Sequence, residues 1–271
     1  ITVHDLRRFH FPETYPRLRG LFLDKMIPRS IEQATKIIAV SEFTKQDILK
    51  LFGIESEKVQ VVHSGIDSHR FSTPASSARK EQIRRQYLLP ELYILAVGHL
   101  EPRKNYAQLI EAYASMRAQK RISHHLVIVG QENWHYQNLY RRIKQLNLDS
   151  HVHFLGFVDF HDLPQIYQMA SLFVAPSLFE GFSFTPLEAM AAGIPVAVSN
   201  TASHPEVCSD AAAYFDPYDV ENMADTLLRL LDDSQFRQRL VHMGKKNILR
   251  FTWEKCIDET FKIYEELLNK I

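Results

Sequence analysis

Short, almost wholly apolar segments alternate with amphipathic segments over most of the chain, and this alternation most restricts the possible fold. The apolar segments are rich in β-branched residues, as expected of strands covered on both faces. Strands are expected at Val59–His63, Tyr93–Val97, Leu126–Val129, Val152–Leu155, Leu172–Ala175 and Val196–Ser199. Helices are expected at Tyr106–Arg117, His135–Leu146, Leu163–Met169 and Thr185–Ala192. Strands and helices in alternation predict an α/β fold with a doubly wound, mostly parallel sheet.

The first part of the chain resembles the end of a separate α/β domain. Further strands are expected at Ile1–Val3 and Lys36–Val40. Ser41 is expected to cap a helix over Glu42–Leu51, because serine favours the position before a helix. Gly53 is expected to end that helix, since glycine favours the position after one.

A domain boundary is expected near residue 67, before the polar stretch from Ser72 to Lys80. On this interpretation residues 1–67 are the C-terminal part of an N-terminal Rossmann-like domain, apparently truncated. Residues 68–271 then form a complete C-terminal Rossmann-like domain. Residues 6–30 mix arginine, aromatic residues and proline without a clear period, so no element is predicted there.

Composition narrows the function classes. The chain is 45% hydrophobic and 24% charged, and its 32 Lys and Arg balance 32 Asp and Glu, so no basic field attracts nucleic acid. Cys208 and Cys256 are too few and too far apart for a disulfide framework or a zinc site, which suits a reducing compartment. No apolar run reaches the roughly 18 residues typical of a membrane span, and no signal peptide is visible. The sequence therefore predicts a cytoplasmic globular protein.

The strongest functional signal is the segment Phe179–Pro195, which follows an expected strand and enters a helix. Backbone N–H groups near Ser183, Phe184 and Thr185 would be free to bind an anion at the helix N-terminus. A strand, a Gly-containing loop and a helix in this order form the place where open α/β sheets bind phosphates. The segment therefore predicts a phosphate site.

Two glutamates flank this helix start. Glu188, about one turn inside the helix, could accept hydrogen bonds from a ribose diol while a diphosphate sits on the helix N-terminus. Glu180, in the preceding loop, could face a sugar ring. The alternative interpretation is that Glu188 is a surface residue and Glu180 a capping acid.

A second signal, Gly98–Asn105, also lies between an expected strand and a helix. Its adjacent cations Arg103 and Lys104 could neutralise a leaving diphosphate without a metal, or form a solvated basic turn. His4 ends the first strand, where it could face a cleft or simply pack. The sequence contains no Asp-x-Asp pair, and the histidines give no third ligand at a plausible spacing, so no metal site is predicted.

Together these segments resemble the retaining glycosyltransferases of family 4, which have the GT-B architecture of two Rossmann-like domains facing across a cleft. The resemblance runs the length of the chain. Glu180 and Glu188 match the glutamate, seven residues, glutamate motif of the family. The other matching segments are Thr2–Leu6, Ile37–Ser41, His63–Asp67, Gly98–Asn105 and Gly156–Val158.

The resemblance implies a role for each position. Glu180 would contact the donor sugar, His4 would line the cleft beside it as a second catalytic residue, and Glu188 would bind the ribose. Arg103 and Lys104 would hold the diphosphate. The further donor-binding positions would be Gly98, Gly156, Phe157, Val158, Gly181, Phe182, Ser183, Phe184 and Thr185, with Gly156–Val158 beside the base. The last helix would cross back to the N-terminal domain.

The implied activity is retaining transfer of a hexose from a nucleotide diphosphate sugar, without metal or cofactor, to a saccharide or lipid-linked saccharide in cell-surface polysaccharide synthesis. The stretch Glu101–Asn105 is similar to that of bacterial polysaccharide mannosyltransferases, which favours GDP-mannose over a UDP-sugar. Two positions depart from the family pattern, because many members have Arg in place of His99 and a second Gly in place of Ser183. A full-length member also carries a further N-terminal segment with a Gly-rich loop facing the donor.

Cations and aromatic residues are mixed between Arg7 and Phe22, which suits peripheral contact with the inner face of the cell membrane. The same mixture is equally typical of an acceptor-side loop packed within its own domain. Two other functions fit the motifs: a non-catalytic module that binds nucleotide sugars, and a GT-B sugar-nucleotide epimerase.

Overall fold

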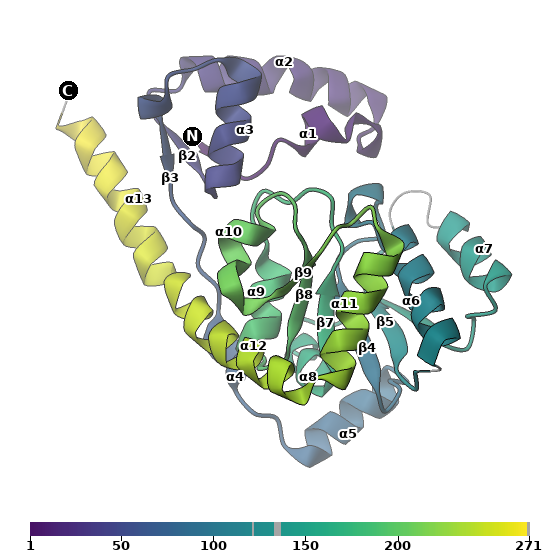
Figure 1. Cartoon of the computed structure of the whole chain (residues 1–271). Coiled ribbons are helices and arrows are strands. Elements are labelled where there is room, and N and C mark those ends of the chain that lie inside the picture. The colour runs from purple at the N-terminus through teal and green to yellow at the C-terminus, as the bar shows by residue number, and fades with distance from the viewer. Residues whose placement is uncertain (121, 133–136, 270–271) are drawn as a thin grey trace.

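The computed structural model describes residues 1–120, 122–132 and 137–269. Its strands form two separate parallel sheets (Figure 1). The strands are β1 (Thr2–Val3), β2 (Ile37–Ala39), β3 (Val59–Val61), β4 (Tyr93–Val97), β5 (His125–Val129), β6 (Val152–Gly156), β7 (Leu172–Ala175), β8 (Val196–Ser199) and β9 (Ala213–Phe215). The helices are α1 (Arg7–His10), α2 (Arg17–Gln33), α3 (Glu42–Phe52), α4 (Ser68–Ser72), α5 (Ser77–Gln86), α6 (Tyr106–Lys120), α7 (Gln137–Gln145), α8 (Leu163–Met169), α9 (Phe184–Ala191), α10 (His204–Cys208), α11 (Val220–Asp232), α12 (Ser234–Asn247) and α13 (Trp253–Leu268).

The large sheet has the strand order β6-β5-β4-β7-β8-β9, with every pair parallel. The chain winds outward from β4 to β6, returns to β7 beside β4, and winds the other way to β9. The carboxyl ends of β4 and β7 are therefore neighbours where the winding reverses, and open α/β sheets bind their ligands at such a point. The predicted doubly wound sheet is confirmed.

Successive side chains along each strand of the large sheet point alternately into two core clusters, one on each face of the sheet. Tyr93 and Leu95 of β4 pack into one core cluster with residues of α8, α9 and α10. Ile94 and Ala96 pack into the opposite cluster with residues of α6 and α11. Because successive side chains of a strand point to opposite faces, every residue of such a segment must be apolar. This requirement produces the continuous apolar runs in the sequence.

The small sheet has the order β1-β2-β3 and is also parallel. Its core lies between the sheet, α2 and α3, and contains Ile31, Ile37 and Ile48. The helix start predicted at Ser41 is confirmed, because its side chain accepts a hydrogen bond from the backbone N–H of Thr44 at 3.0 Å. Gly53 ends the same helix in the left-handed conformation, as predicted (φ 60°).

Helix α2 is the main element that was largely missed, because the sequence predicts a helix only at its end, Ile31–Ala34. It runs for 17 residues where no period was evident, and it contains Pro28 in its interior. Its outward face carries the exposed apolar side chains Leu18, Leu21 and Phe22, which hide the amphipathic pattern. The short elements α5 and β9 were also not predicted. The first two residues of the helix expected at His135–Leu146 lie outside the described residues.

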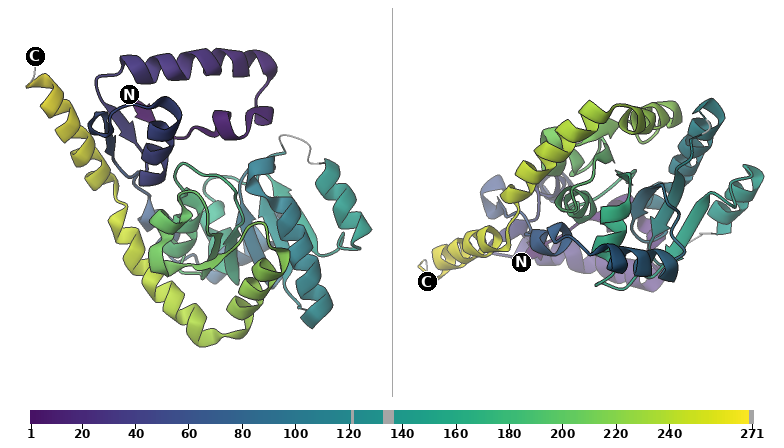
Figure 2. Two further views of the ribbon diagram at one scale, coloured as in Figure 1. Left: turned by 45° about the horizontal axis from the view of Figure 1, so that its top comes forward. Right: turned by 90° about the horizontal axis from the view of Figure 1, so that it is seen from below.

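The chain passes between the two sheets twice, and the two passages are bonded to each other. The N–H of Ile66 donates to the carbonyl of Phe251 at 3.0 Å. Gly65 lies so close to the second passage that a Cβ there would be 2.4 Å from the backbone nitrogen of Trp253. Helix α13 then runs along the small sheet, where Ile263 packs with Ile38 and Val62 (Figure 2).

Candidate functional site

The loops that follow β4 and β7 meet at the reversal point of the large sheet. The Glu180 carboxylate, in the β7–α9 loop (residues 176–183), accepts a hydrogen bond from Lys104 Nζ at 2.6 Å. Its other oxygen lies 2.7 Å from Nη1 of Arg103. Both cations belong to the β4–α6 loop (residues 98–105). The structure thus brings together three residues that the sequence predicted separately.

Glu180 is a permanent anion in this setting. Burial by itself would raise the pKa of its carboxyl, but the charges of Lys104 and Arg103 outweigh burial and lower the pKa to about 2. Each carboxylate oxygen is engaged by one of the two cations. The residue therefore supplies a fixed negative charge, and its oxygens are poorly placed to act as a nucleophile or to carry a proton.

Both terminal nitrogens of the Arg103 guanidinium group are already bonded to other groups of the protein. Nη2 pairs with Glu101 at 2.7 Å, and Nη1 also donates to the carbonyl of Phe179 at 3.0 Å. The residue is only 9% exposed. This geometry favours a role in holding the β7–α9 loop over the direct contact with a diphosphate that the sequence suggested. Lys104 is the better placed of the two for a phosphate, because it has a single carboxylate partner among the described residues.

Helix α9 begins directly after this loop, at the place where the sequence predicts an anion site. Ser183 is its N-cap, but its side chain makes no capping hydrogen bond within the described chain and instead lies 3.4 Å from the hydroxyl of Ser203. The N–H groups of the first turn, at Phe184 and Thr185, therefore lack a side-chain cap. Uncapped N–H groups and the helix dipole both favour an anion there.

Glu188 lies one turn further along α9. Tyr167 Oη donates to its carboxylate at 2.8 Å. Burial raises the pKa of Glu188, while the hydrogen bond from Tyr167 and the nearby charge of Arg70 oppose that shift. Arg70, on α4, was not predicted as part of the site; no sequence signal links α4 to α9, since only the folded chain packs these helices together.

The other predicted donor-binding positions are spread along the same edge of the sheet. Gly98 directly follows β4, with the side chain of Lys104 packed over it, and Gly156 ends β6 in the left-handed conformation with open space above it. Phe157 is largely exposed, and Phe184 is partly exposed. Val158 and Phe182 are buried in the core, so their side chains pack within the protein.

His4 lies in the loop after β1, on the small-sheet side of the site. Its side chain is exposed, and its carbonyl oxygen packs against Gly181 so closely that a Cβ there would be 1.9 Å away. His4 also lines a pocket of about 460 Å³ with Tyr15 and Ile27. The structure therefore places His4 beside the loop that carries Glu180.

His204 is a buried neighbour of the site that sequence reasoning did not single out. It begins α10, after β8, and its Nδ1 lies 2.8 Å from the hydroxyl of Ser199. That hydroxyl donates to the carbonyl of Ser177 at 2.5 Å, so Nδ1 carries the ring proton and the Ser199 oxygen accepts it. Burial lowers the pKa of His204 to about 4, although Glu180 opposes the shift. The residue is one of 13 histidines and belongs to no motif, so no signal distinguishes it.

We expect His204 to make folding sensitive to mild acid. Its pKa in the folded chain lies below that of an unfolded histidine, so the unfolded chain takes up the proton first as the pH falls. Its contribution is complete above about pH 6.5 and is lost between pH 6.5 and 4, by roughly 3 kcal/mol. Urea unfolding of His204→Gln and the unsubstituted chain at pH 7, 5.5 and 4 measures this: the variant should lose less stability, and equal slopes would contradict it.

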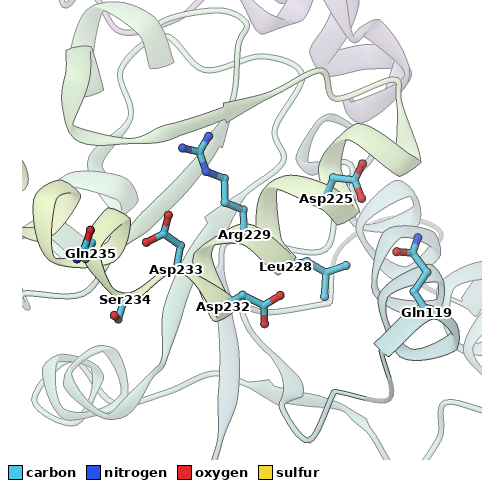
Figure 3. Close-up of a pocket in the computed structure, with 8 residues that line it drawn as sticks. All are labelled: Gln119, Asp225, Leu228, Arg229, Asp232, Asp233, Ser234 and Gln235. Atoms are coloured by element: carbon cyan, nitrogen blue, oxygen red, sulfur yellow. The ribbon is translucent and has the colours of Figure 1, made fainter.

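A larger pocket, of about 730 Å³, is remote from this chemistry. It lies where α6 and α11 end and α12 begins (Figure 3). Helices of a doubly wound sheet run opposite to the strands, so their C-terminal ends lie at the edge away from the site. The pocket is lined by Gln119, Asp225, Leu228, Arg229, Asp232, Asp233, Ser234 and Gln235.

Two family models match the chain: "Glycosyl transferases group 1" over residues 79–247, and "Glycosyltransferase Family 4" over residues 1–70. The chain belongs to the group 1 glycosyltransferases. This group 1 glycosyltransferase is 32% identical to the O-antigen chain mannosyltransferase B of Escherichia coli, over 98% of the chain and 70% of that protein. It is 30% identical to the serotype-specific mannosyltransferase WbdA of E. coli over 98% of the chain, but it spans only 33% of that longer protein.

Solved structures share its fold. Anabaena HepE in complex with UDP and glucose superposes with a TM-score of 0.82 at 21% identity, over 98% of the chain and 71% of HepE. WaaG, a glycosyltransferase involved in lipopolysaccharide biosynthesis, superposes with a TM-score of 0.76 at 21% identity, over 97% of the chain and 73% of WaaG. The predicted GT-B fold and the resemblance to family 4 are confirmed.

No group of three or more His, Cys, Asp or Glu side chains in the described part of this glycosyltransferase is arranged to hold a metal ion. None of its described helices combines the length and the apolar character that crossing a bilayer requires.

Proposed function

We propose that this group 1 glycosyltransferase is a retaining hexosyltransferase that moves mannose from GDP-mannose to a saccharide or lipid-linked saccharide of a cell-surface polysaccharide. The convergence of Glu180, Lys104 and the uncapped start of α9 at the reversal point of the large sheet is the observation that carries the proposal. It combines a place for a diphosphate with a fixed carboxylate, which are the two features that departure of a nucleotide diphosphate from a sugar requires.

The chemistry follows from where charge develops. As the bond between the anomeric carbon and the diphosphate breaks, negative charge grows on the phosphate and positive character grows on the carbon. Lys104 and the N-terminus of α9 stabilise the first, and the Glu180 carboxylate stabilises the second. Retaining glycosidases use a carboxylate as a nucleophile. Here both oxygens of Glu180 are bound by cations, which favours an electrostatic role.

The donor base is the part of the proposal that is simplest to test. The names of the O-antigen relatives support mannose, and the segment Glu101–Asn105 favours GDP. We expect calorimetric titration to show that GDP binds at least about tenfold more tightly than UDP or ADP, a difference of about 1.4 kcal/mol. A clear preference for UDP would exclude GDP-mannose and favour a UDP-sugar.

Turnover distinguishes an enzyme from a module that only binds nucleotide sugars. The release of GDP from GDP-mannose, with and without a saccharide acceptor, measures it directly. Nucleotide binding without release of GDP would favour the binding module. Inversion at C2 of the sugar without release would instead indicate an epimerase.

Helix α2 supports peripheral contact with a membrane. It lies at the outer edge of the small-sheet unit, which comprises β1–β3 with α1, α2 and α3, and away from the large-sheet unit, which comprises β4–β9 and their helices (Figure 1). Leu18, Leu21 and Phe22 are 83%, 59% and 62% exposed on its surface. Arg17, Arg19, Lys25 and Arg29 lie on the same helix. Exposed apolar side chains among cations suit the interface of an anionic bilayer.

We therefore expect the double variant Leu21→Ser/Phe22→Ser to lose affinity for anionic phospholipid vesicles. Each lost apolar side chain removes roughly 1.5–3 kcal/mol of burial when it is fully buried, so a loss of about tenfold or more is expected. Co-sedimentation with vesicles containing phosphatidylglycerol measures it. Leu249→Ser is the control, because Leu249 is an apolar residue outside α2 that is 72% exposed. Equal losses in the two variants would contradict a membrane role for α2.

A further inference from the structure

The start of helix α3, on the small sheet, holds the loop that carries Glu180. The hydroxyl of Ser41 donates to the carbonyl of Gly181 at 2.5 Å, and the hydroxyl of Thr44 donates to the same oxygen at 3.1 Å. Both side chains are buried. Ser41 also accepts the N–H of Thr44 as the helix cap, so its hydroxyl both caps α3 and binds the loop.

A carboxylate from the large-sheet side completes the same junction. Glu206, on α10, accepts hydrogen bonds from the N–H groups of Glu42 and Phe43 at 2.7 and 3.1 Å, and lies 2.6 Å from Nε2 of His63. These N–H groups are the first two of α3, where a helix leaves donors unpaired and favours a negative charge. The first two N–H groups of α3 thus donate their hydrogen bonds to a residue of the large-sheet unit.

The neighbour of Glu180 on its other side is held from the small-sheet side as well. The ring of Phe179 stacks on His10, with centroids 4.6 Å apart, and meets the edge of Phe43 at 5.5 Å. Glu180 thus lies between two residues that are gripped by the small-sheet unit, while its own carboxylate is held by the large-sheet unit. Its backbone position depends on both units being in contact.

We propose that Ser41 and Thr44 are positioning residues for sugar transfer, which hold the Phe179–Gly181 segment so that Glu180 faces the donor sugar only when the two units are closed. This inference rests on the proposed function of the site. In the proposed site the two hydroxyls contact neither the nucleotide sugar nor the saccharide acceptor. They act through the carbonyl of Gly181. Loss of them should slow the chemical step and leave nucleotide binding at Lys104 and α9 intact.

Thr44→Val tests this with little change of shape and without removing the Ser41 cap. Loss of a buried hydrogen bond of this kind should lower kcat for GDP-mannose turnover about tenfold, and Ser41→Ala/Thr44→Val about 100-fold. The donor KM and the calorimetric affinity for GDP should change less than about twofold, since the phosphate site is untouched. Thr44→Ser, which restores the hydroxyl, should recover most of the rate.

Ser76→Ala is the matched control, because Ser76 caps α5 in the same way and does not touch the loop. It should lower stability without lowering kcat. An unchanged kcat in Thr44→Val, or a loss that Thr44→Ser does not recover, would overturn the proposal.

Hydrogen exchange of the peptide spanning residues 178–186 provides a measurement that needs no turnover. Exchange should be faster in Ser41→Ala/Thr44→Val than in the unsubstituted chain and in Ser76→Ala. If the unsubstituted chain neither binds GDP nor turns over GDP-mannose, the proposed function has failed, and the exchange result still decides whether α3 holds the loop. Equal exchange in all three chains would contradict the positioning role.

Discussion

Glu180→Gln should lower the rate of hexose transfer by about 10³-fold while nucleotide affinity changes little. The substitution keeps the shape of the side chain and removes the charge that we propose stabilises the developing positive centre, and a single well-placed electrostatic group contributes about 10²–10³ in rate. The measurement is kcat and KM for GDP-mannose turnover, with calorimetric titration of GDP alongside. Because the carboxyl has a pKa of about 2, the rate should show no acidic limb from this group above pH 4.

Glu188→Gln is the matched control for that result, on the ribose role that the resemblance to family 4 implies for Glu188. It alters the second glutamate of the motif, which is expected at the ribose, so it should raise the donor KM and leave kcat within about tenfold. Glu180→Gln also leaves the buried Arg103 with one carboxylate fewer, so its unfolding free energy must be measured to separate misfolding from lost chemistry. Turnover that survives in a folded Glu180→Gln would remove this residue from the mechanism.

Gly181→Ala should lower transfer by about 100-fold or more through a purely steric effect. A Cβ at Gly181 would lie 1.9 Å from the carbonyl oxygen of His4 and 2.9 Å from Cβ of Asp5. A backbone carbonyl cannot rotate away as a long side chain can, so the two loops must separate. A displacement of about 1 Å at a reacting group can cost about 10²-fold in rate.

Gly53→Ala is the control for that substitution. Gly53 is in the left-handed conformation with open space around it, so alanine there adds strain of about 1 kcal/mol without pushing the units apart. Steady-state kinetics and thermal unfolding of both variants distinguish the two effects. If Gly181→Ala were as active as Gly53→Ala, the working enzyme would not need the close approach of His4 to the β7–α9 loop.

Most of the fold could be predicted because buried parallel strands leave a strong signal. The expected bounds of β4, β7 and β8 match the structure to the residue, since each strand must be apolar on both faces. Helix α2 was missed for the converse reason: its solvent-facing positions carry Leu18 and Phe22, so apolar residues do not mark its buried face.

The candidate site could be predicted in its parts but not in its pairing. Arg103, Lys104 and Glu180 each follow a strand, which is a local property that the sequence displays. That the cations bind Glu180 depends on β4 and β7 being neighbours, although two strands intervene between them in the chain. The approach of His4 to Gly181, and the burial of His204, depend on how surfaces far apart in sequence come together, and no spacing rule reports that.

The two chain segments that connect the sheets are hydrogen-bonded to each other, and this restricts how the sheets can move relative to one another. Gly65 and Ile66 lie against Phe251–Trp253, so both covalent connections run through one line instead of two separated points. Two bodies that are joined along one line can rotate about that line. Sliding or twisting of one body against the other would instead break the Ile66–Phe251 hydrogen bond. We therefore expect the two sheets to move relative to each other mainly by rotation about this line, which would change the distance between the start of α3 and the β7–α9 loop.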